Sequence, residues 1–144
     1  MERNVRTAHE MRSFMRMADY AAGLQHIGIP TTDMAETLLF YTELGFDIVH
    51  SSIQPDNGLA VHFLRLGGLT IEVYEAEAAA LRTGSIDHIA IDVNDVEKAY
   101  EFICSRGMNN LEDEIHFLPY WENGIRYFNI EGPNKERIEF SQYL

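Results

Sequence analysis

The chain has 144 residues, enough for one domain with a sizeable hydrophobic core. Hydrophobic residues make up 46% of it and charged residues 24%, a composition that excludes an intrinsically disordered chain. Eleven Lys and Arg face 23 Asp and Glu, for a formal net charge of -12. Nucleic acid and anionic membrane surfaces are therefore excluded as expected partners, because both attract basic proteins.

Three absences in the sequence indicate a soluble protein of the cytoplasm. The single cysteine, Cys104, cannot form a disulfide within the chain. No run approaches the roughly 20 apolar residues that a membrane helix needs. The N-terminus has no apolar signal core.

Residues 1–23 differ in charge from the rest of the chain. They carry a net charge of +1, whereas the remaining 121 residues carry -13. Apolar residues recur at helical spacing, which predicts an amphipathic N-terminal helix over 7–21 within an arm formed by 1–23. Such a helix docks either on its own domain or on a partner subunit.

From Leu24 onward the sequence repeats itself. At an offset of 62 residues, positions 26–45 and 88–107 share six identities in 20. Further along, Phe63 aligns with Phe128, and the Ile-Glu pair ending at Glu72 aligns with the pair ending at Glu139. We interpret residues 24–144 as a single domain built from module one (24–75), a linker (76–84) and module two (85–144).

Each module is expected to have the order βαβββ. Asp33 and Asp95 are N-cap residue types, and Gly45 and Gly107 suit the helix C-termini. For module one the expected elements are strand 24–29, helix 34–44 and strands 46–53, 59–66 and 69–75. For module two they are strand 87–92, helix 95–106 and strands near 108–112, 124–131 and 136–142. The Ala-rich linker is expected to include a helical turn. The predicted class is α+β, with the eight strands in a curved mixed sheet or half-barrel.

Two histidines and two glutamates occupy matching positions of the repeat: His26 and Glu72, His88 and Glu139. Each Glu interrupts an apolar strand, so it is expected on the face opposite its buried neighbours. If the duplicated halves pack about a pseudo-twofold axis, all four side chains meet. Imidazole and carboxylate donors suit Ni, Zn, Co, Mn or Fe, and we predict one such divalent ion in an open, catalytic site. The alternative, for each residue taken singly, is that the histidine packs in the core and the glutamate lies on a solvent-exposed face of its strand.

The other histidines and the cysteine are weaker candidates. His62 and His116 have no counterpart in the repeat, while His9 and His50 fall in the N-terminal helix and at a strand end. Cys104 is interpreted as a packing residue of the second helix. No nucleophile elbow, phosphate loop or dinucleotide fingerprint is present.

Four segments resemble the glyoxalase, or vicinal oxygen chelate, superfamily, which is built from paired βαβββ modules. They are LQHIGIPTTDMAETLLFYTELGF, TIEVYE, IDHIAIDVNDVEKAYEFICSRG and EGPNKERIEFSQ. The order His, Glu, His, Glu resembles glyoxalase I (lactoylglutathione lyase). This resemblance implies His26, Glu72, His88 and Glu139 as metal ligands.

The resemblance also implies a reaction. A metal-dependent lyase or isomerase of this type abstracts a proton next to a carbonyl through a metal-stabilised enediolate. The substrate is a hemithioacetal or a related 2-oxo or 2-hydroxy compound. Glu139 is the expected base, and Glu72 stays bound or acts on the opposite face.

Two other functions within the superfamily remain alternatives. One is an epimerase or isomerase resembling methylmalonyl-CoA epimerase, and the other is a metal-free small-molecule-binding or resistance protein. Pro30 and Ala76 stand where glutathione-using relatives carry Arg and Asn, which argues against glutathione as the thiol. Arg65 and Arg126 are the candidates for anion contacts instead. Relatives commonly form homodimers, so the metal site lies either within one chain or across two.

Overall fold

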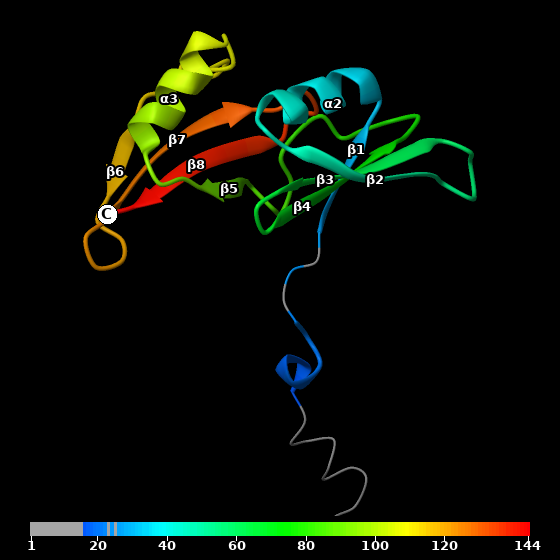
Figure 1. Ribbon diagram of the computed structural model, residues 1–144, viewed down its shortest axis with the longest axis horizontal. Helices are drawn as coiled ribbons and strands as arrows, with labels where there is room; N and C mark the ends of the chain where they lie inside the picture. The colour runs from blue at the N-terminus through cyan, green and yellow to red at the C-terminus, as the bar shows by residue number, and fades with distance from the viewer. Residues whose placement is uncertain (1–15, 23, 25) are drawn as a thin grey trace, which may run out of the picture.

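The computed structural model describes residues 16–22, 24 and 26–144 (Figure 1). Of the expected N-terminal helix, residues 7–15 lie outside this part. Within 16–22 there is a single 3-10 turn, η1 (Met17–Asp19), followed by exposed, non-helical chain. The helix therefore does not continue to residue 21. None of the helices in the described residues combines the length and apolar character needed to cross a membrane.

Module one forms a four-stranded sheet with one helix. Its elements are β1 (Ile27–Thr31), α2 (Met34–Glu43), β2 (Asp47–Ile53), β3 (Ala60–Leu66) and β4 (Leu69–Glu75). The strand order is β1-β4-β3-β2, with β1 parallel to β4 and the other pairs antiparallel.

Module two repeats this topology. Its elements are β5 (Ile89–Asp92), α3 (Val96–Ser105), β6 (His116–Leu118), β7 (Ile125–Glu131) and β8 (Arg137–Tyr143). The strand order is β5-β8-β7-β6, again with one parallel pair, β5 and β8. The α+β class and the two tandem βαβββ modules are thus confirmed, with the eight strands divided between two four-stranded mixed sheets.

The helix ends follow the residue types expected for them. Asp33 Oδ1 accepts a hydrogen bond from the Glu36 backbone N at 3.0 Å, and Asp95 accepts the equivalent bond from Lys98. Gly45, just after α2, has a φ of 103°, a left-handed conformation that favours glycine.

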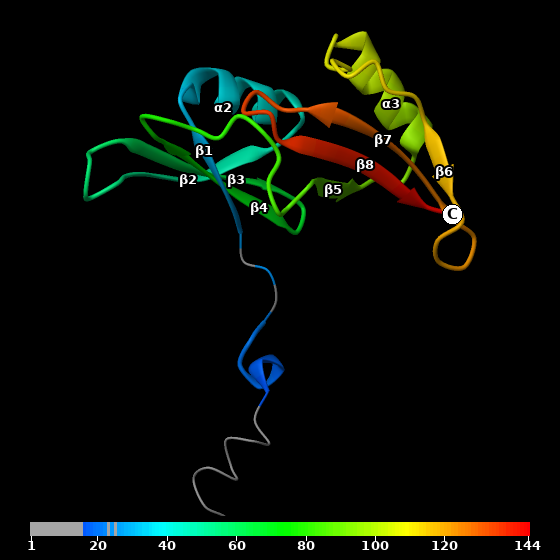
Figure 2. The same ribbon diagram turned by 180° about the vertical axis from the view of Figure 1, so that it is seen from behind.

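Strand alternation separates a buried face of each sheet from an open one. In β4, Ile71 and Val73 are buried while Glu72 between them is half-buried, and Ile138 and Phe140 flank Glu139 in the same way. Both helices lie on the same side of the sheets in the two opposite views (Figure 1, Figure 2). The glutamates therefore lie on the sheet faces that no helix of the described chain covers.

The modules touch through side chains rather than through strand pairing. Tyr41 Oη on α2 donates to Glu136 Oε1 at 2.8 Å, and Asn134 Nδ2 donates to Thr37 Oγ1 at 3.0 Å. Both bonds join α2 to the turn between β7 and β8. Glu72 and Glu139 belong to neither of these contacts.

The structure corrects four local expectations. The strand expected near 108–112 is instead β6 (His116–Leu118), and the linker 76–84 has no helical turn. Cys104 is exposed, so it is not a packing residue. In register, Phe63 lies opposite Glu72 whereas Asn129 lies opposite Glu139, so the counterpart of Phe63 is Asn129 rather than Phe128.

Candidate metal site

The first His–Glu pair lies on the open face of module one. His26 immediately precedes β1, and Gly28, two residues on, is paired in register with Glu72 on β4. This parallel pairing puts His26 Nε2 3.1 Å from Glu72 Oε2. The His26 ring also packs edge-on against Phe63 of β3, with centroids 5.6 Å apart. Both donors are reachable from solvent, with side chains 33% and 28% exposed.

The second pair repeats this arrangement on module two. His88 precedes β5, Ala90 is paired with Glu139 on β8, and His88 Nε2 lies 3.7 Å from Glu139 Oε2. The other ring nitrogen, Nδ1, is 3.0 Å from Asp87 Oδ2. This hydrogen bond with His88 lowers the pKa of the Asp87 carboxyl. A carboxylate on one ring nitrogen is the usual support for a histidine whose other nitrogen binds metal.

The donor atoms suit a divalent metal in both identity and spacing. Metal–nitrogen and metal–oxygen bonds of about 2.1 Å at a right angle put the two donor atoms about 3.0 Å apart, and a tetrahedral angle puts them about 3.4 Å apart. The distances of 3.1 Å and 3.7 Å lie near these values. Each pair therefore has the donor types and spacing of two ligands of one metal ion.

The two His–Glu pairs do not meet in the part of the chain that the structure describes. Among the described residues, no group of three or more His, Cys, Asp or Glu side chains is gathered closely enough to hold a metal ion. The structure thus brings His26 to Glu72 and His88 to Glu139 but leaves the two pairs on separate sheets.

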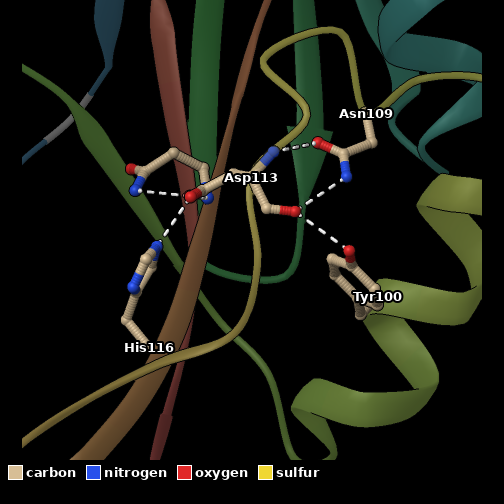
Figure 3. Close-up of polar contacts among 5 residues, drawn as sticks. Tyr100, Asn109, Asp113 and His116 are labelled. Atoms are coloured by element: carbon tan, nitrogen blue, oxygen red, sulfur yellow. Dashed lines mark hydrogen bonds and ion pairs between the residues drawn. The ribbon is translucent and has the colours of Figure 1, made fainter.

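Asp113 forms a polar network on module two that the sequence did not indicate (Figure 3). Its Oδ1 is 2.6 Å from His116 Nε2, and its Oδ2 accepts from the Asn129 backbone N at 2.8 Å. Its backbone carbonyl accepts from Tyr100 Oη on α3 and from Asn109 Nδ2, both at 2.9 Å. Burial alone would raise the pKa of Asp113, but the bonds from His116 and Asn129 outweigh it and lower that pKa.

This network holds the 107–115 loop to the edge of β7 and orients His116. His116 is paired in register with Tyr127, two residues before Asn129, the cross-strand neighbour of Glu139. Alternation therefore puts His116 on the same open face as Glu139. No sequence signal pointed to His116, because the repeat has no matching histidine. Its partner Asp113 lies in a loop and not in a strand with a recognisable pattern.

The structure separates the two candidate anion-binding arginines. Arg126 Nη1 is 2.9 Å from Glu97 Oε1 on α3, so it is already paired. Arg65 on β3 lines a cavity together with His26 and with His50, which lies within β2 rather than at its end. His62 is hydrogen-bonded through Nδ1 to Ser51 at 2.7 Å and does not line this cavity.

Comparisons with known proteins agree with this architecture. The sequence profile of the Glyoxalase/Bleomycin resistance protein/Dioxygenase superfamily matches residues 23–140. A Bacillus subtilis (strain 168) protein, the uncharacterized protein YwbC, is 33% identical over 129 residues, which cover 85% of this chain and 98% of YwbC.

Solved structures share the fold at lower identity. A glyoxalase family protein from Enterococcus faecalis superposes with a TM-score of 0.67 at 19% identity, covering 85% of this chain and 98% of that one. The fosfomycin resistance protein FosX from Listeria monocytogenes, solved with Mn(II) and sulfate, gives 0.62 at 20%, covering 86% and 94%. The profile match spans most of the chain and both modules, and this protein belongs to the Glyoxalase/Bleomycin resistance protein/Dioxygenase superfamily.

Proposed function

We propose that the protein is a metal-dependent lyase or isomerase of the glyoxalase I type. It would bind one divalent ion (Ni, Zn, Co, Mn or Fe) per site. The ligands are the four matched side chains of the duplication: His26, Glu72, His88 and Glu139. The observation that carries this proposal is the recurrence of a close His–Glu pair on the open face of each module, at 3.1 Å and 3.7 Å.

Each complete site is formed between two copies of the chain in a homodimer. Module one of one chain supplies His26 and Glu72, and module two of a second copy supplies His88 and Glu139. This arrangement is supported by the separation of the two pairs in the described part of the chain, because two ligands alone leave metal coordination positions to fill.

Exposed apolar side chains also support a second copy. On β2, Ile48, Val49 and Ile53 are 47%, 44% and 60% exposed, and Phe117 on β6 is 57% exposed. These are edge strands of the two sheets, and apolar residues gathered at such positions are typical of surfaces that associate. Association would remove this surface from water.

A metal in this site would supply Lewis-acid stabilisation of the negative charge that develops on a substrate oxygen. The protein's own part is the transfer of the proton on the carbon next to the carbonyl. Glu139 is the better base of the two glutamates, because its side chain is 15% exposed against 28% for Glu72, and it lies farther from its histidine. Glu72 stays engaged with His26 or handles the proton on the opposite face.

The substrate is a hemithioacetal or a related 2-oxo or 2-hydroxy compound. Such a molecule carries oxygens on two adjacent carbons, and the hydroxyl-bearing carbon next to the carbonyl carries the proton that the base removes. FosX, which shares the fold, was solved with Mn(II), and this supports a divalent metal in this architecture.

Metal titration of the full-length protein tests the ligand set. We expect His26→Ala, Glu72→Gln, His88→Ala and Glu139→Gln each to weaken Mn(II) or Ni(II) binding strongly, measured by calorimetry. His62→Ala and Glu101→Gln are the matched controls, since neither residue belongs to a pair, and both should bind like the wild type. Absence of metal binding by the wild-type protein would refute the proposal.

The reaction is tested by thioester formation from methylglyoxal with several thiols. Glu139→Gln should reduce turnover by at least about a hundredfold, because general-base catalysis contributes about 10²–10⁴-fold. Its circular dichroism and melting temperature should match those of Glu101→Gln. Full activity in Glu139→Gln would show that another group is the base.

A further inference from the structure

A cavity adjoins the metal-binding pair of module one. It has a volume of about 360 Å³ and lies on the open sheet face, where its walls include His26, Phe63 of β3 and His50 of β2. Small-ligand sites have volumes of about 300–1,000 Å³, so this cavity accommodates a small substituent rather than a whole cofactor. A substrate reacting beside His26 would extend into it.

The charge of this cavity is opposite to that of the protein. Among the residues that the structure describes, its walls include no Asp or Glu, although the chain carries 23 of them, and Arg65 is the one permanently charged wall residue. Arg65 Nε donates to Thr70 Oγ1, another wall residue, at 3.2 Å. This bond fixes the guanidinium and leaves its two terminal nitrogens to bind something else.

Arg65 has no carboxylate partner among the residues that the structure describes. Asp47 lies opposite it in register on β2 but forms no ion pair with it. Arg126, by contrast, is paired with Glu97 at 2.9 Å. Arg65 is thus an oriented cation beside the candidate site.

Module two does not repeat this feature. The position matching Arg65 is Glu131, one residue beyond the strand pair formed by Ile130 and Ile138. The Glu131 carboxylate binds Lys135 Nζ at 2.9 Å. The two modules therefore offer the same candidate ligands but differ in the residue beside them, which is Arg65 in module one and Glu131 in module two. A substrate bound at the site would consequently prefer one orientation.

We propose that Arg65, oriented by Thr70, binds an anionic group of the substrate, a carboxylate or a phosphate. The proposal rests on the proposed function and narrows its substrate to 2-oxo or 2-hydroxy compounds that carry a second, negatively charged end. The guanidinium fork matches the oxygens of either anion and forms strong charge-assisted hydrogen bonds with them. The reacting end of the same molecule lies toward His26 and Glu72.

Binding of three 2-hydroxy acids to the metal-loaded, full-length protein tests this subsite. Lactate has no second anion, malate has a second carboxylate, and 3-phosphoglycerate has a phosphate. We expect malate or 3-phosphoglycerate to bind at least about tenfold more tightly than lactate, since a charge-assisted bidentate contact is worth that much. Which of the two gains more identifies the anion.

The variants assign the gain to Arg65. In Arg65→Gln the preference over lactate should disappear, in Arg65→Lys it should be reduced, and in the matched control Arg126→Gln it should persist. Metal affinity should be the same in all of them. An unchanged preference in Arg65→Gln, or equal binding of all three acids by the wild type, would overturn the subsite.

A metal-free measurement separates this proposal from the metal chemistry. Inorganic phosphate added to the protein without metal should shift the Arg65 side-chain NεH resonance, and Arg126 should not respond. If the protein binds no metal but Arg65 responds, the proposed reaction fails and the anion site stands. If the protein binds metal but the binding of phosphate and of the acids does not depend on Arg65, only the anion-site proposal fails.

Discussion

Glu136 joins the two modules through a mostly buried carboxyl group. Burial raises its pKa above the ordinary value of 4.5, and the hydrogen bonds from Tyr41 Oη and the Asn134 backbone N only partly oppose this. The Tyr41 hydroxyl, itself buried beside that carboxylate, has its pKa raised as well. The folded protein therefore favours the protonated acid more than the unfolded chain does.

This shift predicts a pH dependence with a definite sign. The stabilising contribution of a protonated Glu136 is complete below pH 4.5 and is lost as the pH rises through the raised pKa of the folded state. Glu136→Gln should remove this part of the profile, so its free energy of unfolding should fall less than that of the wild type over this range. Denaturant unfolding at a series of pH values measures it, with Glu101→Gln as control. If the free energy of unfolding changes with pH in the same way for the wild type and Glu136→Gln, Glu136 is not the source of this pH dependence.

At the scale of elements, regular hydrophobic patterns predicted most of the secondary structure. Strands β3, β4, β7 and β8 and both long helices begin and end within a residue or so of their expected positions. The prediction of a strand near 108–112 was wrong. The 107–115 loop is held by side-chain hydrogen bonds of Asn109 and Asp113 rather than by backbone pairing with a neighbouring strand. Such bonds depend on tertiary neighbours and leave no periodic signal.

Asp113 takes the place that a longer β6 would occupy beside β7. Asp113→Ala removes the acceptor for the Asn129 backbone N and the partner of His116, and should destabilise the protein by about 1–3 kcal/mol. Hydrogen exchange should quicken at the Asn129 amide and through the 107–115 loop. Glu112→Gln, a change to the neighbouring exposed carboxylate, should leave exchange unaltered. Equal hydrogen-exchange rates in Asp113→Ala and the wild type would show that contacts other than those of Asp113 hold the loop.

At the scale of the whole molecule, the duplication predicted two equivalent modules with matching His and Glu residues. It also predicted that all four side chains meet if the modules pack about a pseudo-twofold axis, whereas the described chain holds them as two separate His–Glu pairs. It did not predict how the modules lie relative to one another. That arrangement depends on contacts such as Thr37 with Asn134 and Tyr41 with Glu136, which join residues far apart in the sequence at positions the repeat does not match. The charge of -12 does not identify the site either, because Glu72 and Glu139 are distinguished by repeated position alone.

The sharing of one metal site by two chains is tested most directly by mixing two defective variants. His26→Ala retains an intact module two, and His88→Ala retains an intact module one. After equal mixing and subunit exchange, half of the dimers should be mixed and each should have one intact site, restoring about a quarter of the wild-type metal content and activity. His26→Ala mixed with Glu72→Gln, two changes in the same module, should restore none. No recovery in the first mixture, with mixed dimers demonstrated by native mass spectrometry, would contradict a site shared between chains.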